Sequence, residues 1–358
     1  MEESQVGAYL NKNILALMER ASSLLEETSS SRPEWIEEVI HHQALSANRR
    51  EELESEGVHV PAFMILSVTR RCNLNCKGCY SRELHSGQGS EMDDVLLRSL
   101  LEQSSKLGIS IILTAGGEPF LRKGLVSILS DFPEIIFPLF TNGLLLTRER
   151  IEEIQSARNI VPVLSIEGFE DTTDSRRGEG VFKRLRNSLP LLSSFDIFWG
   201  ISITVTGDNF GDVTGPEFVN ELIENGCRLF IFVEYIPVEE GSEHLAPTME
   251  QRSRLIELMR ELGSHHPALF ITFPGDEDAL GGCLSSGRGF VHINASGDLE
   301  PCPFAPYSDT NLRDMPLKEA LRSELLARIR ENHHMLEETR GGCALWENRE
   351  WVRDLLDL

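Results

Sequence analysis

The sequence contains no run of about 18 apolar residues, so no transmembrane helix is expected. Its first residues, Met1–Ser4, lack the basic and apolar regions of a secretory signal peptide. The seven cysteines are an odd number, which argues against a framework of disulfides. These absences predict a cytoplasmic protein whose cysteines are free thiols or metal ligands.

Positive charge is also scarce. The chain has 34 Lys and Arg against 57 Asp and Glu, which gives a formal net charge of -23. An acidic surface repels phosphate backbones, so no nucleic-acid partner is expected. A local basic pocket would still accept a small phosphorylated molecule. The 358 residues, 41% of them hydrophobic, are enough for one large domain and a smaller one.

Three cysteines, Cys72, Cys76 and Cys79, lie close together just after a short apolar segment. Soft thiolate sulfur selects zinc, copper or iron–sulfur clusters. A structural zinc site needs a fourth ligand, and the next candidate, His85, lies in a polar stretch that we expect at the surface. Three thiolates leave one metal position open, which suits a [4Fe–4S] cluster whose fourth iron binds another ligand.

Residues 1–60 are predicted to be a helical extension. Apolar residues from Leu10 to Leu25 follow helical spacing, Ser29–Pro33 ends this helix, and a second helix is expected from about Glu34 to Leu53. The first helix is interpreted as packing on the main domain, with a membrane-surface or substrate-recruiting helix as the alternative. Its polar face carries glutamates such as Glu19 rather than lysines, which argues against anionic membranes.

A regular alternation of strands and helices follows in residues 61–273. Apolar segments are predicted as six strands, at Phe63–Thr69, Ile109–Thr114, Ile135–Thr141, Ile160–Ile166, Phe198–Val205 and Leu229–Ile236. Helical segments are predicted between them, at Asp93–Leu107, Glu149–Ala157, Val181–Leu191 and Pro216–Asn225. Parallel strands need such crossover helices. We therefore expect an α/β fold, a partial (β/α)6 TIM-like barrel with reactive groups at the carboxyl ends of its strands.

Polar motifs occur at these strand ends. Gly116-Gly117-Glu118-Pro119 follows the second strand, and two glycines allow a ligand to approach the backbone closely. Asn142 follows the third strand. Ser165 and Glu167 are two residues apart and so point to one face of the sheet.

Further candidate ligand contacts follow along the chain. Arg176 and Arg177 offer guanidinium groups for a carboxylate. Glu234 and Tyr235 end the sixth strand and are candidates for contacts with substrate or cofactor. Cys227 opens that strand and is expected to be a buried apolar residue.

The cysteine triplet, the Gly-Gly-Glu-Pro motif and the six β/α units together resemble the radical S-adenosylmethionine (SAM) superfamily over about residues 62–240. The resemblance implies that Cys72, Cys76 and Cys79 ligate three irons of a [4Fe–4S] cluster, and that SAM binds the fourth. An external donor such as flavodoxin or ferredoxin would supply the electron that cleaves SAM to methionine and a 5′-deoxyadenosyl radical.

The resemblance also implies roles for residues around SAM. Gly116, Gly117 and Glu118 would contact its amino group, and Ser165 and Arg177 its ribose and carboxylate, with Arg176 as the alternative guanidinium. Asn142, Glu167 and Glu234 are further candidates at neighbouring strand ends. The family often has an aromatic residue before the third cysteine. Here that residue is Gly78, and Tyr80 follows instead as the candidate for the adenine contact.

Residues 274–346 are predicted to form a small cysteine-bearing module, followed by a terminal helix at 347–358. A strand at Phe290–Ala295 enters a tight turn at Gly297. Cys283, Cys302 and Cys343 resemble the shortened, twitch form of the SPASM module, which implies a second, auxiliary [4Fe–4S] cluster. Water, substrate or His292 would be its fourth ligand. A zinc site, or no metal at all, is the alternative.

The resemblance implies hydrogen abstraction from an unactivated C–H bond, followed by oxidation or bond formation assisted by the auxiliary cluster. A peptide side chain is the leading substrate hypothesis, with a small molecule close behind. A third hypothesis is modification or coupling of lipid chains, with peripheral membrane contact and the N-terminal helices forming a tunnel. A deep apolar tunnel would favour lipid and an open acidic groove a peptide. The non-enzyme alternative is an iron–sulfur scaffold, sensor or electron carrier.

Overall fold

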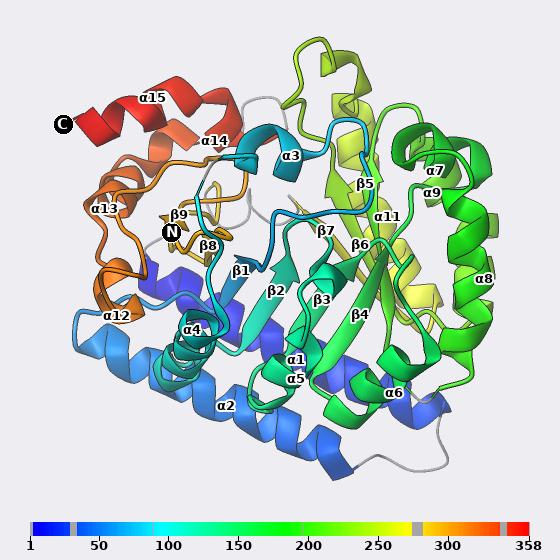
Figure 1. Ribbon diagram of the computed structural model, residues 1–358, viewed down its shortest axis with the longest axis horizontal. Helices are drawn as coiled ribbons and strands as arrows, with labels where there is room; N and C mark the ends of the chain where they lie inside the picture. Colours follow the sequence, from blue (N-terminus) through cyan, green and yellow to red (C-terminus); the bar gives the residue numbers. More distant parts are fainter. Residues whose placement is uncertain are drawn as a thin grey trace.

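The computed structural model describes residues 3–28, 34–87, 89–195, 197–273, 282–336 and 342–357. The N-terminal extension consists of helices α1 (Glu3–Thr28) and α2 (Glu34–Ser55), which pack against each other below the sheet (Figure 1). Both predicted helices are therefore confirmed, and the predicted break at 29–33 lies outside the described residues. None of the helices in the described ranges is both long and apolar enough to cross a membrane.

The centre of the molecule is one curled, open sheet with the order β7-β6-β5-β4-β3-β2-β1-β8-β9. All neighbouring strands pair in parallel except β8 and β9. The strands are β1 (Phe63–Ser67), β2 (Ile111–Ala115), β3 (Phe137–Thr141), β4 (Ile160–Ser165), β5 (Gly200–Val205), β6 (Leu229–Glu234), β7 (Leu269–Phe273), β8 (Phe290–Ile293) and β9 (Leu299–Glu300). The predicted partial TIM-like barrel is confirmed, and all six predicted strands are present.

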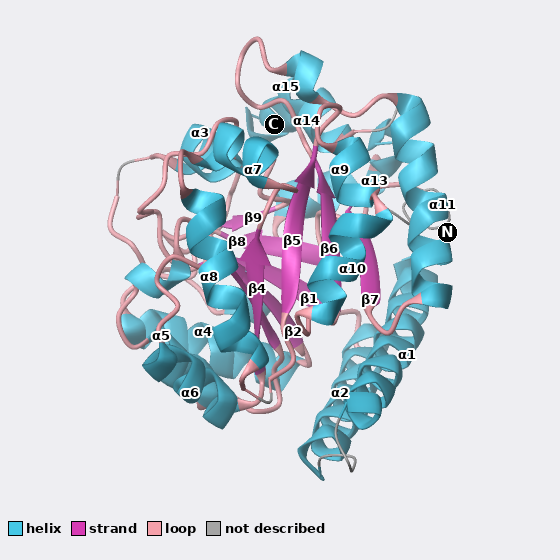
Figure 2. Ribbon diagram, turned by 90° about the vertical axis from the view of Figure 1, so that its right-hand side faces the viewer, coloured by secondary structure: helices cyan, strands magenta, loops and turns pink. Residues whose placement is uncertain are grey.

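Crossover helices cover the convex side of the sheet (Figure 2). They are α4 (Asp94–Leu107), α5 (Leu125–Ser130), α6 (Arg148–Ala157), α8 (Val181–Ser193), α10 (Pro216–Glu224) and α11 (Met249–His265). Their ends follow local sequence signals. The Asp93 side chain accepts a hydrogen bond from the Leu96 N–H at the start of α4, and Gly108, with φ 83°, ends that helix.

Shorter helices complete the chain at the carboxyl ends of the strands and in the C-terminal region. They are α3 (Tyr80–His85), α7 (Glu170–Arg177), α9 (Phe210–Thr214), α12 (Leu317–Ala320), α13 (Glu324–Glu331), α14 (Ala344–Glu347) and α15 (Arg349–Asp354). Single 3₁₀ turns lie at Pro119–Leu121, Glu243–Leu245, His333–Leu336 and Leu355–Asp357. The expected terminal helix corresponds to α15 and the turn after it.

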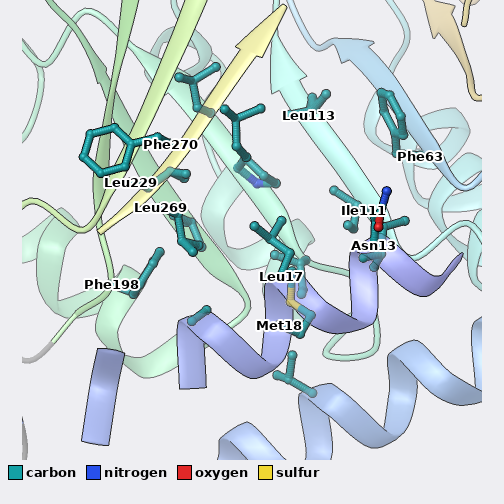
Figure 3. A pocket seen from close by; sticks show the side chains of 18 of the residues that line it. Asn13, Leu17, Met18, Phe63, Ile111, Leu113, Phe198, Leu229, Leu269 and Phe270 are labelled. Carbon is teal, nitrogen blue, oxygen red and sulfur yellow. The ribbon is translucent and has the colours of Figure 1, made fainter. Parts of the chain in front are cut away.

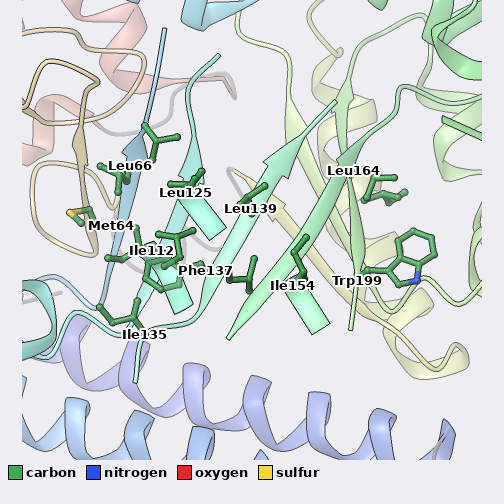
Figure 4. Packing of buried hydrophobic residues seen from close by; sticks show 14 of the residues in the cluster. Met64, Leu66, Ile112, Leu125, Ile135, Phe137, Leu139, Ile154, Leu164 and Trp199 are labelled. Atoms are coloured by element: carbon green, nitrogen blue, oxygen red, sulfur yellow. The ribbon is translucent and has the colours of Figure 1, made fainter. Parts of the chain in front are cut away.

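Alternate residues of each strand face opposite sides of the sheet. Met64, Ile112 and Phe137 pack under the crossover helices in the main hydrophobic core (Figure 4). On the concave side, Val163 and Ile231 belong to a second apolar cluster that also contains side chains of α1. The extension therefore closes the concave side of the open barrel near the amino ends of the strands.

The C-terminal region joins the main sheet rather than standing apart from it. β8 pairs in parallel with β1, so that Ile65 lies opposite His292. β9 then pairs antiparallel with β8 through the tight turn expected at Gly297, whose φ is 96°. This pairing brings Cys302, two residues after β9, close to the cysteine loop that follows β1.

Candidate active site

The glycine motif after β2 is strapped to the chain just before Cys72. The Gly117 N–H donates to the Thr69 carbonyl at 2.7 Å, and the Glu118 N–H donates to the Arg71 carbonyl at 2.8 Å. A Cβ on Gly117 would lie 2.1 Å from the Arg71 carbonyl oxygen. The backbones therefore meet at a distance that only glycine permits.

Other strand ends hold the Cys72–Cys79 segment, here called the cysteine loop. Asn142, after β3, donates its side-chain amide to Asn73 Oδ1 at 2.7 Å. The Lys77 N–H donates to the carbonyl of Arg176 in α7 at 2.9 Å. The ends of β2 and β3 and the helix after β4 thus fix the position of the loop. Of the predicted site residues, Asn142 contacts the loop itself, and Gly116 and Gly117 contact the chain just before it.

Electrostatic interactions link the three thiols of the cysteine loop, and Arg176 and Arg177 lie near Cys76. Loss of solvent raises the pKa of Cys76. The neighbouring Arg177 and Arg176 lower this pKa, and Cys79 raises it. Loss of solvent is also the largest cause that raises the pKa of Cys72; the Leu74 N–H lowers it, and Cys76, Glu118 and Cys79 raise it further. Three neighbouring thiols beside cationic groups are a suitable donor set for an iron–sulfur cluster, which binds thiolates.

Glu118 joins the ends of β2 and β3. Its carboxylate is 1% exposed and accepts hydrogen bonds from Thr141 Oγ1 at 2.8 Å, from the Asn142 N–H at 2.8 Å and from the Phe120 N–H at 3.1 Å. Burial raises the pKa of Glu118 although these donors lower it. The carboxylate therefore binds protein groups and positions the glycine motif.

Glu167, two residues after β4, joins the ends of β4 and β5 in the way that Glu118 joins those of β2 and β3. The side chains of Arg176 and Arg177 both donate to Glu167 Oε1 at 2.6 Å, and the Thr204 N–H donates to its Oε2 at 2.8 Å. The side chain of Glu167 is 1% exposed. Both arginines therefore point inward, because both bind this one buried carboxylate. Arg177 is also close enough to influence Cys76 and Cys79.

The side chains of Ser165, Glu234 and Cys227 differ in their hydrogen-bond partners and burial. Ser165 ends β4, and within the described ranges its hydroxyl has no hydrogen-bond partner. Glu234 ends β6 and pairs with Arg252 of α11. Cys227 is fully buried, and burial raises its pKa to about 12, as expected of an apolar structural cysteine.

The ring of Tyr235, the residue after β6, occupies the space beside the glycine that precedes the third cysteine. Gly78 has φ 61°, and a Cβ there would lie 2.2 Å from the Tyr235 hydroxyl oxygen. Tyr235 is 2% exposed, and its hydroxyl has no hydrogen-bond partner among the described residues. The family's aromatic side chain is thus absent at Gly78, but an aromatic ring reaches the same part of the loop from the end of the sixth strand.

The C-terminal cysteines also converge. Burial, followed by the neighbouring Cys343 and Cys283, raises the pKa of Cys302. The three side chains belong to one packed cluster. Tyr80 links this group to the cysteine loop, because its ring lies 5.1 Å from the Phe304 ring and its pKa is raised by burial and then by Cys79 and Cys302. Tyr80 therefore faces the C-terminal region.

His85 is not a surface residue, which corrects the expectation from its polar surroundings. Its side chain is 7% exposed, and its Nε2 lies 2.7 Å from the Pro303 carbonyl. Its ring packs against His292, whose two nitrogens contact Ser67 and Glu300 at 2.8 and 2.7 Å. Both nitrogens of His292 are thus already bound, which leaves the predicted fourth-ligand role without a free atom in this arrangement.

Residues 66–214 match the Radical SAM superfamily. Residues 66–214 therefore form a radical SAM domain. Membership implies a SAM-binding [4Fe–4S] cluster and an electron donor, and the three thiols of the cysteine loop fit such a cluster. The protein is therefore an enzyme rather than only a scaffold, sensor or electron carrier.

This radical SAM enzyme is similar to several characterised relatives. It is 25% identical over 320 residues to an AdoMet-dependent heme synthase of Methanosarcina barkeri, covering 82% of this chain and 90% of that one. It is 27% identical over 303 residues to PqqA peptide cyclase of Bradyrhizobium diazoefficiens, covering 80% and 77%. The crystal structure of Streptococcus suis SuiB has the same fold, with a TM-score of 0.64 at 16% identity and coverage of 87% and 79%.

Proposed function

We propose that this enzyme reductively cleaves SAM and uses the resulting 5′-deoxyadenosyl radical to abstract hydrogen from an unactivated C–H bond of a peptide or small molecule. The observation that carries the proposal is the cysteine loop, held by hydrogen bonds from two strand ends and α7. A cluster bound at Cys72, Cys76 and Cys79 would supply the electron, and the chain's own residues hold SAM in place and exclude water.

We propose two roles for the residues of the site: some contact SAM, and others position the residues that do. The backbone of Gly116 and Gly117 and the hydroxyl of Ser165 are proposed to contact SAM, because each lies at a strand end and the hydroxyl is not used by the described protein groups. Glu118, Glu167 and Glu234 are proposed to position these strand ends, because each carboxylate binds protein donors. Arg177 and Asn142 are proposed to orient the site from beside the loop.

The decisive experiment is SAM cleavage by the reconstituted, reduced enzyme. We expect 5′-deoxyadenosine to form even without substrate, through uncoupled turnover, and to be detected by liquid chromatography. Cys76→Ala should form none, because one ligand of the cluster is lost. Cys227→Ala is the matched control, because Cys227 is buried and precedes the amino end of β6, whereas the cysteine loop follows the carboxyl end of β1. Absence of 5′-deoxyadenosine from the wild-type enzyme would contradict the proposal.

We further propose that Cys283, Cys302 and Cys343 bind an auxiliary [4Fe–4S] cluster that assists oxidation or bond formation. Their convergence in one buried cluster of side chains supports this. The enzyme should contain about eight irons per chain, four at each set of thiolates. Replacing all three C-terminal cysteines by alanine should leave about half of the iron measured by a colorimetric assay. If this variant keeps all of its iron, the auxiliary cluster is wrong.

Radical modification of lipid chains is the second candidate function. It is favoured by one observation, an apolar cavity on the concave side of the barrel. The substrate would then be a small amphiphilic molecule instead of a peptide.

A further inference from the structure

A cavity of about 800 Å³ lies between α1 and the concave face of the sheet (Figure 3). Its apolar lining includes Ile14, Leu17, Met18, Ala21, Phe198 and Leu229. Protein interiors contain few voids larger than a water molecule, because an empty apolar space forfeits contacts on one side of every lining atom. A space of this size is typical of sites that hold a small ligand.

The shape of the cavity follows α1. Residues of this helix that line it run from Tyr9 to Leu25, which corresponds to about 24 Å along the helix axis at 1.5 Å per residue. In Figure 3, Leu113 and Phe63 stand at one side and Leu269 and Phe270 at the other, with Leu17 and Met18 below them. The space is therefore long enough for an extended apolar chain.

Two exposed arginines belong to the lining of the cavity. Arg158, at the end of α6, and Arg260, on α11, both line the cavity and are exposed. Neither guanidinium has an ion-pair or hydrogen-bond partner in the part of the chain that the structure describes. Arg158 also holds φ 62°, a left-handed conformation that a helix end normally assigns to glycine or asparagine. In a chain of net charge -23, two such free cations indicate an anionic ligand group.

The cavity extends toward the proposed reaction site. Its lining includes Leu113, two residues before the end of β2, and Phe273, the last residue of β7. Two residues of strand correspond to about 7 Å. A chain in the cavity would thus approach the strand ends at which the glycine motif and the cysteine loop lie.

A peptide fits this space poorly. Each buried peptide residue brings an N–H and a C=O that need hydrogen-bond partners. The lining between α1 and the strands consists largely of aliphatic and aromatic side chains, which offer none. An alkyl or prenyl chain has no such requirement, and its burial is favourable in proportion to its apolar area.

We infer that the cavity binds the long apolar chain of an amphiphilic substrate, whose carboxylate or phosphate group binds Arg158 and Arg260. This inference rests on the proposed function and deepens it by naming the substrate class. The N-terminal extension then has a specific task, because α1 forms one wall of the chain-binding site.

The test is equilibrium dialysis of the reconstituted holoenzyme with radiolabelled palmitic acid. We expect saturable binding of about one molecule per chain, displaced by hexadecyl phosphate but not by inorganic phosphate. Ala21→Trp fills the cavity and should abolish binding, whereas Ala8→Trp, on an exposed part of the same helix, should not. Both variants should keep their iron and their uncoupled SAM cleavage, which shows that they are folded.

The arginines are tested separately. Arg158→Gly combined with Arg260→Gln should weaken binding about tenfold, equal to about 1.4 kcal/mol. Arg254→Gln, on the same helix α11 but paired with Glu261 and outside the cavity, should leave the affinity unchanged. Glycine at position 158 also relieves the left-handed backbone, so lost binding would not reflect lost folding.

Three outcomes would overturn the inference. They are no saturable palmitate binding, binding that survives Ala21→Trp, or saturable binding of coproporphyrin III in place of palmitate, which would assign the cavity to a macrocycle. The proposed function fails in a different way. If palmitate binds as expected but SAM is never cleaved, the cavity assignment stands and the radical reaction is wrong. If SAM is cleaved but palmitate does not bind, the radical reaction stands and the cavity assignment is wrong.

Discussion

Gly117→Ala is expected to reduce SAM cleavage by about a hundredfold or more, because a misplacement of about 1 Å at a reacting centre is enough for such a loss. The added Cβ would lie 2.1 Å from the Arg71 carbonyl oxygen, a distance that no pair of unbonded heavy atoms tolerates. The contacted atom is backbone, so it cannot move aside as a flexible side chain would. The glycine motif and the cysteine loop must therefore separate, and both are proposed to surround SAM.

The measurement for this variant is 5′-deoxyadenosine formation together with iron content. We expect a loss of the first and at least partial loss of the second, because Arg71 immediately precedes Cys72. Gly263→Ala is the control. It lies within α11 with nothing within 4 Å of its added Cβ, and alanine favours a helix there by about 0.5–1 kcal/mol. Wild-type turnover by Gly117→Ala would show that the two segments are not held together as described.

Glu167→Gln is expected to destabilise the enzyme by about 3–5 kcal/mol, the usual result of removing one member of a buried ion pair. The substitution keeps the shape of the side chain but leaves Arg176 and Arg177 without their shared carboxylate. The side chains of these arginines are only 17% and 9% exposed, so water compensates them poorly. Arg177 also lies near Cys76, so altered retention of iron should accompany the loss of stability.

Urea unfolding of the variant and the wild type at neutral pH tests this expectation. Glu319→Gln provides the comparison, because Glu319 pairs with Arg322 at the surface and each side chain is 53% exposed. Exposed pairs contribute about 0–1 kcal/mol, so this control should unfold almost as the wild type does. Equal stability of the two variants would mean that Glu167 does not neutralise the buried charges of Arg176 and Arg177.

The main architecture was predictable because the local spacing of apolar residues predicts its strands and helices. The six strands and their crossover helices follow from short apolar segments and caps such as Asp93. β7 is not among the predicted strands, although Leu269–Phe273 is apolar, because the sequence pattern predicts that the alternation of strands and helices ends after β6. The pairing of β8 with β1 joins segments more than 200 residues apart, and no local pattern specifies such a partner.

The site was predictable in its residue types and less so in their partners. The sequence placed carboxylates at the strand ends, but it could not show that Glu118 binds Thr141 or that Glu234 binds Arg252. His85 was misjudged for the same reason. Its burial depends on Pro303 and His292, which the fold brings to it from a distant part of the chain. The cavity under α1 likewise arises only when the helix is laid across the sheet.

The addition of β8 to the edge of β1 has a consequence for how this chain can be divided. A parallel sheet that ended at β1 would present a row of unpaired backbone groups next to the strand that carries the cysteine loop, and such an edge invites association with other chains. β8 covers this edge, and the buried side chain of His292 links it to Ser67 of β1 and to Glu300 of β9. Removing the C-terminal region would therefore expose this edge of the barrel and favour association with other chains.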